Sequence, residues 1–192
     1  MLTQLRPAAF LLLAMTLLTG LAYPLAMTGI AQLLMPGAAN GSLILRDGQT
    51  VGSALIAQRF VGAGYLHPRP SAVDFGTTPS GATNLGPTSA ALAAEVAERR
   101  AEWKALNGVP APVDAVTTSG SGLDPHVSPE NARGQAARIA AARGVAVDAV
   151  LAIIEAQTEP RWLGLFGEAR VNVLRVNLAL DEGLPLPPAG TN

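Results

Sequence analysis

The sequence AAFLLLAMTLLTGLAYPLAMTGIAQLLM, residues 8–35, decides how this chain is organised. Neither Asp, Glu, Lys nor Arg occurs between Arg6 and Arg46, and the surface helix of a soluble protein does not show so long an uncharged stretch. About 20 predominantly apolar residues suffice to cross the roughly 30 Å of hydrocarbon in a bilayer. The segment therefore predicts one transmembrane helix, and its internal Gly and Pro residues are ones that membrane helices tolerate.

A cleaved signal peptide is the main alternative for this segment. The apolar region of a signal peptide is about 7 to 15 residues long and ends at a small-x-small site. Here the apolar run is longer, and its nearest such site, Gly29-Ile30-Ala31, comes late. A retained anchor is therefore favoured, with a buried core helix as a more distant alternative. We expect residues 1–35 to carry the anchor helix and residues 36–192 to form one soluble domain.

The charges that flank the anchor favour one orientation. Arg6 and the free amino group lie on one side, whereas Arg46 and Arg59 lie further from the membrane on the other. Because positive charge close to a span stays in the cytoplasm, we expect the N-terminus inside. This orientation places the soluble domain outside the cytoplasm.

Beyond the anchor, the pattern predicts an α/β domain with a small mixed sheet and about three helices. Ser42 to Leu45 is a candidate first strand, and the polar corner Arg46-Asp47-Gly48 follows it. Residues 62–87 are rich in Gly and Pro and predict a long loop. Residues Arg170 to Asp181 alternate between apolar and polar types, which predicts a half-buried strand. We expect Pro185 to Asn192 to be a frayed end.

Capping residues place the three helices. The first is expected from Ala90 to Leu106, after the hydroxyls of Thr88 and Ser89 and before Asn107-Gly108. The second opens at Ser128-Pro129-Glu130 and ends near Arg143-Gly144. The third starts at about Ala146. The predicted buried stripe of this third helix consists of Val147, Val150, Leu151 and Ile154.

Several functional classes are excluded by composition and motif. Lys104 is the only lysine, so the chain has neither a Walker A lysine nor the phosphorylated loop of P-type pumps. His67 and His126 are the only histidines and match no zinc-ligand spacing. A Ser121-His126-Asp124 triad would lack the G-x-S-x-G elbow of a hydrolase. We therefore expect no catalytic residue and no metal site in this chain.

Nucleic acid is an unsuitable partner for this composition. The chain has 13 Lys plus Arg against 14 Asp plus Glu, and aromatic residues make up 4% of it. A nucleic-acid module would show a basic stripe with interleaved aromatic residues. The anchor makes the membrane the first predicted partner instead.

Two Gly-rich segments are candidates for function. They are SGATNLGP, residues 80–87, and SGSGLDP, residues 119–125. Such loops can point several backbone amides at one anion. In the structural alternative, the glycines permit positive φ in tight turns while Ser, Asn and Asp bond their own backbone. The pattern alone favours this structural interpretation.

Five motifs, taken in order, resemble a known family. They are Gly52-Ser53-x-Leu55-Ile56-x-Gln58, Arg69-Pro70-Ser71-Ala72, Asn84-Leu85-Gly86-Pro87, Ser119-Gly120-Ser121-Gly122-Leu123-Asp124-Pro125-His126 and Arg170-Val171-Asn172-Val173-Leu174. From its anchor to about Asp181, the chain resembles the C subunit of the Kdp potassium-transporting ATPase, the KdpC family. The run from Ser119 to His126 is the most distinctive of the five motifs.

The resemblance implies an accessory, non-catalytic subunit of an ATP-driven, high-affinity potassium importer in the bacterial inner membrane. Its implied partners are a channel-like potassium-translocating subunit, a P-type ATPase subunit and a very small membrane peptide. One implied role is assembly and stability, combined with a catalytic chaperone activity that raises the ATP affinity of the pump subunit. The other is an extracytoplasmic subunit that stabilises or gates the channel-like subunit and binds no nucleotide.

The resemblance also assigns candidate site residues. The predicted contacts to ATP, shared with the pump subunit, are Ser119, Gly120, Ser121, Gly122 and Gln135. Among these, Gln135 would contact the ribose. The predicted partner-facing residues are Asn84, Leu85, Gly86, Leu123, Asp124 and His126.

Overall fold

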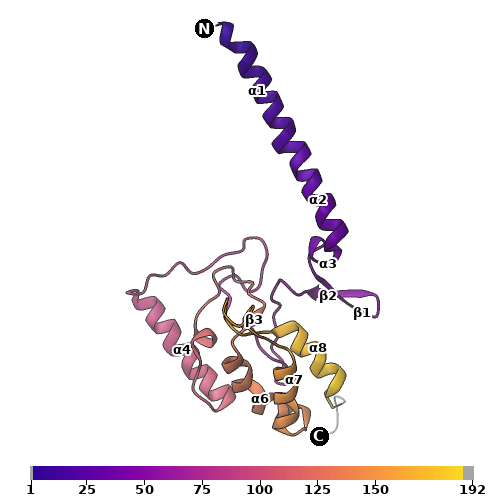
Figure 1. Cartoon of the computed structure of the whole chain (residues 1–192). Helices are drawn as coiled ribbons and strands as arrows, with labels where there is room; N and C mark the ends of the chain where they lie inside the picture. Colours follow the sequence, from indigo (N-terminus) through magenta and orange to yellow (C-terminus); the bar gives the residue numbers. More distant parts are fainter. Residues whose placement is uncertain (1, 188–192) are drawn as a thin grey trace. The chain divides into compact units, whose positions relative to one another are not determined.

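The computed structural model of the protein describes residues 2–187, and the last residues of the expected frayed end lie outside this range. Contacts divide the chain into two units, Met1–Val51 and Gly52–Asn192. Figure 1 shows the elements of both units along the chain. The predicted division at residues 35 and 36 stays a prediction.

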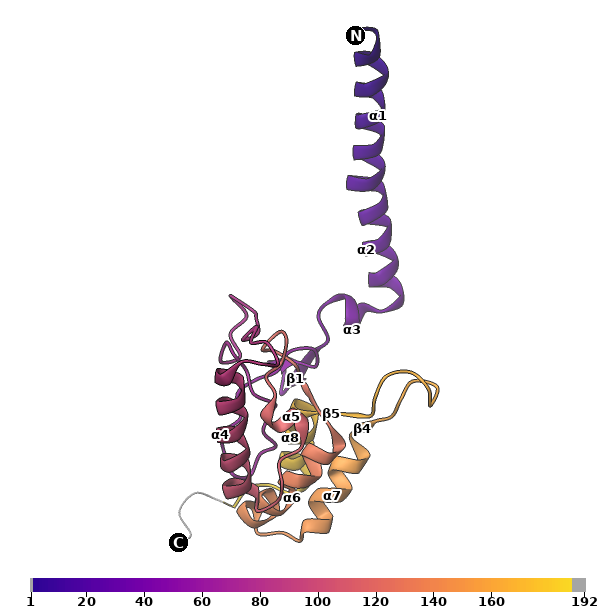
Figure 2. The same cartoon turned by 90° about the vertical axis from the view of Figure 1, so that its left-hand side faces the viewer.

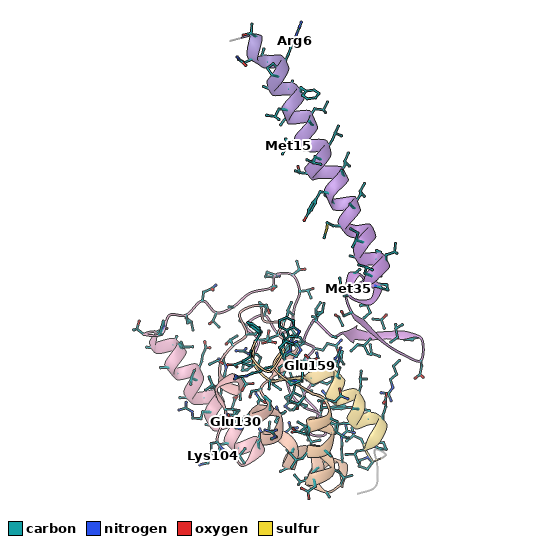
Figure 3. The ribbon with its side chains drawn as sticks, viewed as in Figure 1. Arg6, Met15, Met35, Lys104, Glu130 and Glu159 are labelled. Atoms are coloured by element: carbon teal, nitrogen blue, oxygen red, sulfur yellow. The ribbon has the colours of Figure 1, made fainter. Side chains whose placement is uncertain are left out.

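The first unit begins with a long apolar helix. A 3-10 turn, η1 (Leu2–Gln4), leads into α1 (Leu5–Leu17), a π-helical turn η2 (Leu18–Ala22) and α2 (Tyr23–Leu34). From Leu5 to Leu34 the helix is 30 residues long, and an 18-residue stretch within it has a mean hydropathy of 1.9 and no buried residue. Figure 3 shows its side chains pointing outward all the way from Arg6 to Met35. This helix fits a single-pass membrane protein.

Pro24, two residues after the end of η2, explains the π-helical turn. Pro24 lacks an N–H, and in a regular helix its ring would clash with the carbonyl four residues earlier. The wider turn of η2 relieves this clash, and the N–H of Tyr23 donates to the carbonyl of Leu18, five residues back. The Thr19 hydroxyl adds a bond to the carbonyl of Met15 at 2.7 Å.

A short helix and a hairpin follow the apolar helix. They are α3 (Pro36–Ala39), β1 (Leu43–Arg46) and β2 (Gln49–Ser53). The two residues between the strands, Asp47 and Gly48, have φ of 52° and 76°, which suits the right-handed twist of a two-residue hairpin. The predicted first strand and polar corner are confirmed.

The second unit contains five helices and three short strands among the described residues. The helices are α4 (Ala90–Asn107), α5 (Val113–Val116), α6 (Pro129–Arg143), α7 (Val147–Ala156) and α8 (Val173–Gly183). The strands β3 (His126–Val127), β4 (Thr158–Glu159) and β5 (Arg170–Asn172) form an antiparallel sheet in the order β3-β5-β4. Figures 1 and 2 both show α6 between α4 and α7. The α/β class is confirmed, with its strands in two small antiparallel sheets.

The core of the second unit lies where α6, α7, α8 and β5 meet. Its largest fully buried apolar side chains are Leu66, Ile139, Val150, Ile154, Val171, Val176 and Leu180. Of the stripe predicted for α7, Val150 and Ile154 are buried and Leu151 packs against the core, whereas Val147 is 41% exposed.

The predicted helix boundaries at α4, α6 and α7 are confirmed. The Ser128 hydroxyl accepts a hydrogen bond from the N–H of Asn131 at 3.0 Å, and Ser89 accepts one from the N–H of Leu92 at 3.4 Å. Gly108 and Gly144 end α4 and α6 with φ of 73° and 67°. Serine caps and left-handed glycines therefore set these ends as the sequence predicts.

The prediction of one strand from Arg170 to Asp181 is wrong. Only Arg170–Asn172 is extended, and α8 begins at Val173. The Asn172 side chain accepts the N–H of Arg175 at 3.1 Å and so caps α8. Residues 173, 174, 176, 177 and 180 are buried, which is a helical spacing. Asn177 is polar yet buried, so it does not count as a core residue in an apolar pattern. The remaining apolar residues then alternate every second position, as they would in a strand.

The predicted loop over residues 62–87 is confirmed, and amide side chains hold its first part. Asn177 accepts the N–H of Leu66 at 2.7 Å and donates to its carbonyl at 2.9 Å. Gln135 pairs in the same way with the backbone of His67, at 2.8 and 3.1 Å. These two side chains supply the hydrogen bonds that a neighbouring strand would otherwise provide.

A buried arginine joins the same loop to α8. The Arg143 side chain is 0% exposed, and its guanidinium donates to the carbonyls of Gly64, Leu180 and Leu184 at 2.6–3.0 Å. It also pairs with Asp181 at 2.9 Å and lies over the Tyr65 ring, 5.1 Å from its centroid. These four hydrogen bonds offset the free-energy cost of burying the charged guanidinium.

Candidate functional site

The two Gly-rich segments meet in space. The carbonyl of Ser121 accepts hydrogen bonds from the N–H of Gly81 at 3.0 Å and from the Ser80 hydroxyl at 2.8 Å. A Cβ added at Gly122, which has φ of +70°, would lie 2.4 Å from Val73 and 2.9 Å from the carbonyl of Gly81. Glycine is therefore required at residue 122 both for its φ and for this close approach.

Serine hydroxyls accept hydrogen bonds from the backbone amides of the second Gly-rich loop. The buried Ser119 hydroxyl accepts the N–H of Ser121 at 3.3 Å and that of Gly122 at 2.9 Å. The Ser121 hydroxyl accepts the N–H of Leu123 at 3.1 Å. The N–H of Ser119 itself donates to the carbonyl of Pro70. In this conformation, these four amides donate to the protein's own oxygen atoms.

Arg69 and Asp124 tie the loop to the chain before it. Their side chains form an ion pair at 3.1 Å, and the same guanidinium lies within 3.3–3.4 Å of the carbonyls of Thr117 and Thr118. The other oxygen of Asp124 accepts the N–H of His126 at 3.0 Å. Asp124 therefore fixes the turn that leads into β3.

A pocket of about 310 Å³ opens beside this ion pair. Its polar lining comes from Arg69, Asp114, Asp124, His126, Ser128, Glu168 and Arg170. Asp114 accepts both the N–H and the hydroxyl of Ser128, at 2.7 and 3.0 Å. His126 Nδ1 lies 3.8 Å from Asp124, while the Ser121 hydroxyl bonds within its own loop. The three side chains of the hypothetical Ser121-His126-Asp124 triad therefore do not form a hydrogen-bonded catalytic chain, because the Ser121 hydroxyl bonds within its own loop.

A larger cleft of about 480 Å³ lies between α4 and the segment 59–75. The arginines Arg59, Arg69 and Arg99 line it, together with Trp103 from α4 and Gln135 from α6. Arg59 pairs with Asp74, and Arg99 pairs with Glu95 at 2.9 Å. The carboxylates Asp74 and Glu102 also line the cleft, and each of its three arginines already has a carboxylate partner.

Gln135 is buried at the wall of this cleft. Besides its two bonds to His67, it donates to Asn131 at 2.7 Å and accepts from Arg138 at 2.6 Å. Burial lowers the pKa of Arg138 to about 10, so this guanidinium stays charged at neutral pH. The Gln135 side chain would have to give up a hydrogen bond to contact a ribose.

The remaining predicted partner-facing residues fall into two groups. Asn84 and Gly86 are exposed, and Asn84 has φ of 55°. Leu85, Leu123, Asp124 and His126 are half-buried. The segment 84–86 therefore offers more open surface for a partner than the turn at 123–126.

Both histidines are predicted to destabilise the protein as the pH falls. Burial, then nearby Arg138, lowers the pKa of His67, and burial, then nearby Arg170, lowers the pKa of His126. The unfolded chain therefore binds protons at these histidines more readily than the folded protein does. The contribution of the neutral histidines to the free energy of unfolding is fully present above their ordinary pKa of 6.5 and is lost as the pH falls below it. Melting temperatures measured from pH 7.5 to 5.5 should fall, and less so in a His67→Gln/His126→Gln variant. Equal slopes would contradict this assignment.

Two features of the structure carry no motif that predicts their role. The buried Arg143 looks like an ordinary residue of a helix end, because nothing local distinguishes it from a solvated one. The run RWLGLFG, residues 161–167, forms the connection between β4 and β5 and exposes four large apolar side chains. Two glycines among four large apolar residues, with charges on both sides, are the signal that marks this run.

Comparison with known proteins gives consistent matches over nearly the whole chain. The family model described as "K+-transporting ATPase, c chain" matches residues 5–182. A protein of Cereibacter sphaeroides named potassium-transporting ATPase KdpC subunit is 68% identical over 181 residues, covering 94% of this chain and 98% of the relative. Proteins of the same name from Rhodospirillum rubrum and Polaromonas naphthalenivorans are 56% and 51% identical. Each of these two matches covers 97% of this chain and at least 98% of the relative.

Proposed function

This chain belongs to the KdpC family of potassium-transporting ATPase subunits, and on that premise we propose that it is the assembly and stabilising subunit of the pump. In this proposal, α1 and α2 anchor it in the bacterial inner membrane with the N-terminus in the cytoplasm. The second unit stands outside the cytoplasm and docks on the channel-like subunit, where it stabilises or gates potassium entry. The P-type ATPase subunit and the small membrane peptide complete the complex.

One observation supports docking rather than anion binding as the role of the Gly-rich loops. The amides of Ser121, Gly122 and Leu123 all donate to serine hydroxyls within the loop. An anion-binding loop needs such donors directed at its ligand. The loops therefore serve as rigid turns that shape a surface, and the exposed segment 84–86 is the part of them that we assign to the partner contact.

Orientation is tested by protease added to spheroplasts that carry the full chain. We expect cleavage of the second unit while a cytoplasmic marker protein stays intact. If the chain is cut only after the spheroplasts are lysed, the domain is cytoplasmic and the docking proposal is wrong.

The docking surface is tested by recovery of the complex through a tagged partner subunit. A Gly86→Glu variant should co-purify less well, because a Cβ at Gly86 meets nothing within 4 Å and the new charge therefore points at the partner. Val113→Glu is the control, since Val113 is 77% exposed on α5. Equal recovery of both variants would remove segment 84–86 from the interface.

The second candidate is the chaperone role, in which this subunit contacts ATP and raises the ATP affinity of the pump subunit. The larger cleft supports this role, because three arginines and Gln135 line it and because Ser71, another lining residue, donates to the carbonyl of Gly122 at 2.8 Å. ATP would then lie across the cleft and the loop Ser119–Gly122. Isothermal titration of the full chain with ATP tests this candidate directly, since the absence of heat would dispose of it.

A further inference from the structure

The connection between β4 and β5 carries the most exposed apolar cluster of the second unit. The exposed fractions of Trp162, Leu163, Leu165 and Phe166 are 69%, 71%, 78% and 59%. We call residues 161–167 the apolar loop. Figure 2 shows it projecting away from the helices of this unit. Soluble surfaces rarely gather four such side chains on one turn unless something covers them.

The loop is a built turn rather than a loose connection. The backbones of Trp162 and Phe166 exchange two hydrogen bonds, at 2.9 and 3.0 Å, and their ring centroids are 5.6 Å apart. Leu163 and Gly164 turn the chain with φ of 52° and 73°. Because these bonds fix the turn, its apolar side chains are held outward before any ligand arrives, which lowers the entropy cost of burying them.

Charged residues surround the base of the loop. Arg170 and Arg175 both pair with Glu159, at 2.8 and 3.2 Å, while Arg161 and Glu168 flank the apolar residues. The arginines outnumber the glutamates, so the base is weakly cationic. An apolar tip with Trp and Phe above a cationic base suits the headgroup region of an anionic bilayer.

We propose that the apolar loop inserts into the headgroup and acyl boundary of the bilayer that holds the anchor helix. This inference rests on the membrane anchoring in the proposed function. The chain between Leu34 and Gly52 spans at most about 60 Å, and a unit of this size is roughly 40 Å across. Because α3 and the β1–β2 hairpin shorten this connection further, the second unit cannot move far from the bilayer, and a rotation of the unit can bring the loop to it. Insertion gives the second unit a second membrane contact and restricts its rotation on the tether.

The two tryptophans of the chain make the test specific. The anchor contains none, and Trp103 lies on α4, so a Trp103→Phe variant reports on Trp162 alone. This full-length variant is reconstituted into phosphatidylethanolamine–phosphatidylglycerol vesicles that contain phosphatidylcholine brominated near the headgroup. We expect blue-shifted emission, quenching by the brominated lipid and protection from aqueous acrylamide. Adding Leu165→Ser/Phe166→Ser should reverse all three, whereas Val113→Ser, at 77% exposure, should change none.

The remaining outcomes overturn the proposal in different ways. Emission that acrylamide quenches and brominated lipid does not would mean that the loop stays in water. Protection only after the other pump subunits are added, without lipid quenching, would mean that the loop docks on protein. Failure of the chain to float with the vesicles would refute the anchor in the proposed function, and this inference with it.

Discussion

Replacing Arg143 by methionine is expected to lower the free energy of unfolding by about 3–5 kcal/mol. The substitution removes the donor that the carbonyls of Gly64 and Leu184 have in the structure. It also removes one donor each from the Leu180 carbonyl and the Asp181 carboxylate, which keep the N–H of Leu184 and the Tyr65 hydroxyl. Methionine fills part of the volume but donates no hydrogen bond. Urea unfolding of the full chain in detergent micelles, followed by tryptophan fluorescence, measures the loss.

A matched variant separates burial from charge. Arg133 also pairs with a carboxylate, that of Glu155 at 2.7 Å, but its side chain is 51% exposed. Arg133→Met should therefore change stability by about 0–1 kcal/mol. A shift as small for Arg143→Met as for Arg133→Met would show that the buried network contributes little. Adding Asp181→Asn to Arg143→Met should recover only part of the loss, because the carbonyls of Gly64 and Leu184 still lack their donor.

Asn177→Leu is expected to cost about 2–4 kcal/mol, since each buried polar group left unpaired costs about 1–3 kcal/mol. Leucine has a similar volume, but it bonds neither the N–H nor the carbonyl of Leu66, a residue that is 0% exposed. Hydrogen exchange at the Leu66 amide, together with urea unfolding, measures both consequences. The amide should exchange much faster in the variant.

The control for this prediction lies on the same helix. Arg175 is 49% exposed and pairs with Glu159, so Arg175→Leu should change stability by about 0–1 kcal/mol and leave exchange at Leu66 unchanged. If the Leu66 amide stays protected in Asn177→Leu, something other than the Asn177 side chain holds this segment.

Local chemistry explains which parts of the fold the sequence predicts. Helix ends are marked by residues that act on their own neighbours, as Ser128 does on Asn131 and as Gly144 does through its positive φ. The anchor helix is predictable for a similar reason, because hydropathy is a property of the segment itself. These signals need no knowledge of what the element packs against.

Tertiary context explains the rest. The strand predicted from Arg170 to Asp181 is a helix after Asn172, because its buried face includes the polar Asn177, whose partner Leu66 lies 111 residues away in sequence. A pattern built from apolar residues does not reveal that a polar amide side chain is buried. The same holds for Gln135, which the family resemblance marks as a nucleotide contact and which the structure places against the backbone of His67.

The candidate site follows the same division. That both Gly-rich segments are turns is the interpretation that the pattern favours, and the close approach at Gly122 gives its reason. That Ser80 and Gly81 meet Ser121 depends on contacts between segments roughly forty residues apart, which no local signal contains. The ATP contacts, the partner-facing residues and the orientation stay predictions.

The hydrogen bonds of the segment 64–67 also set an order of events during synthesis. The donors and acceptors that complete this segment come from Gln135, Arg143 and Asn177, so all of them leave the ribosome after it. Contacts of such long sequence separation form slowly. The early part of the domain therefore waits until α8 has been made, and under the proposed anchoring it waits at the membrane. A chain that stops before Asn177 lacks the side chain that pairs with Leu66, so under the same proposal it would be a membrane-bound substrate for proteolytic quality control.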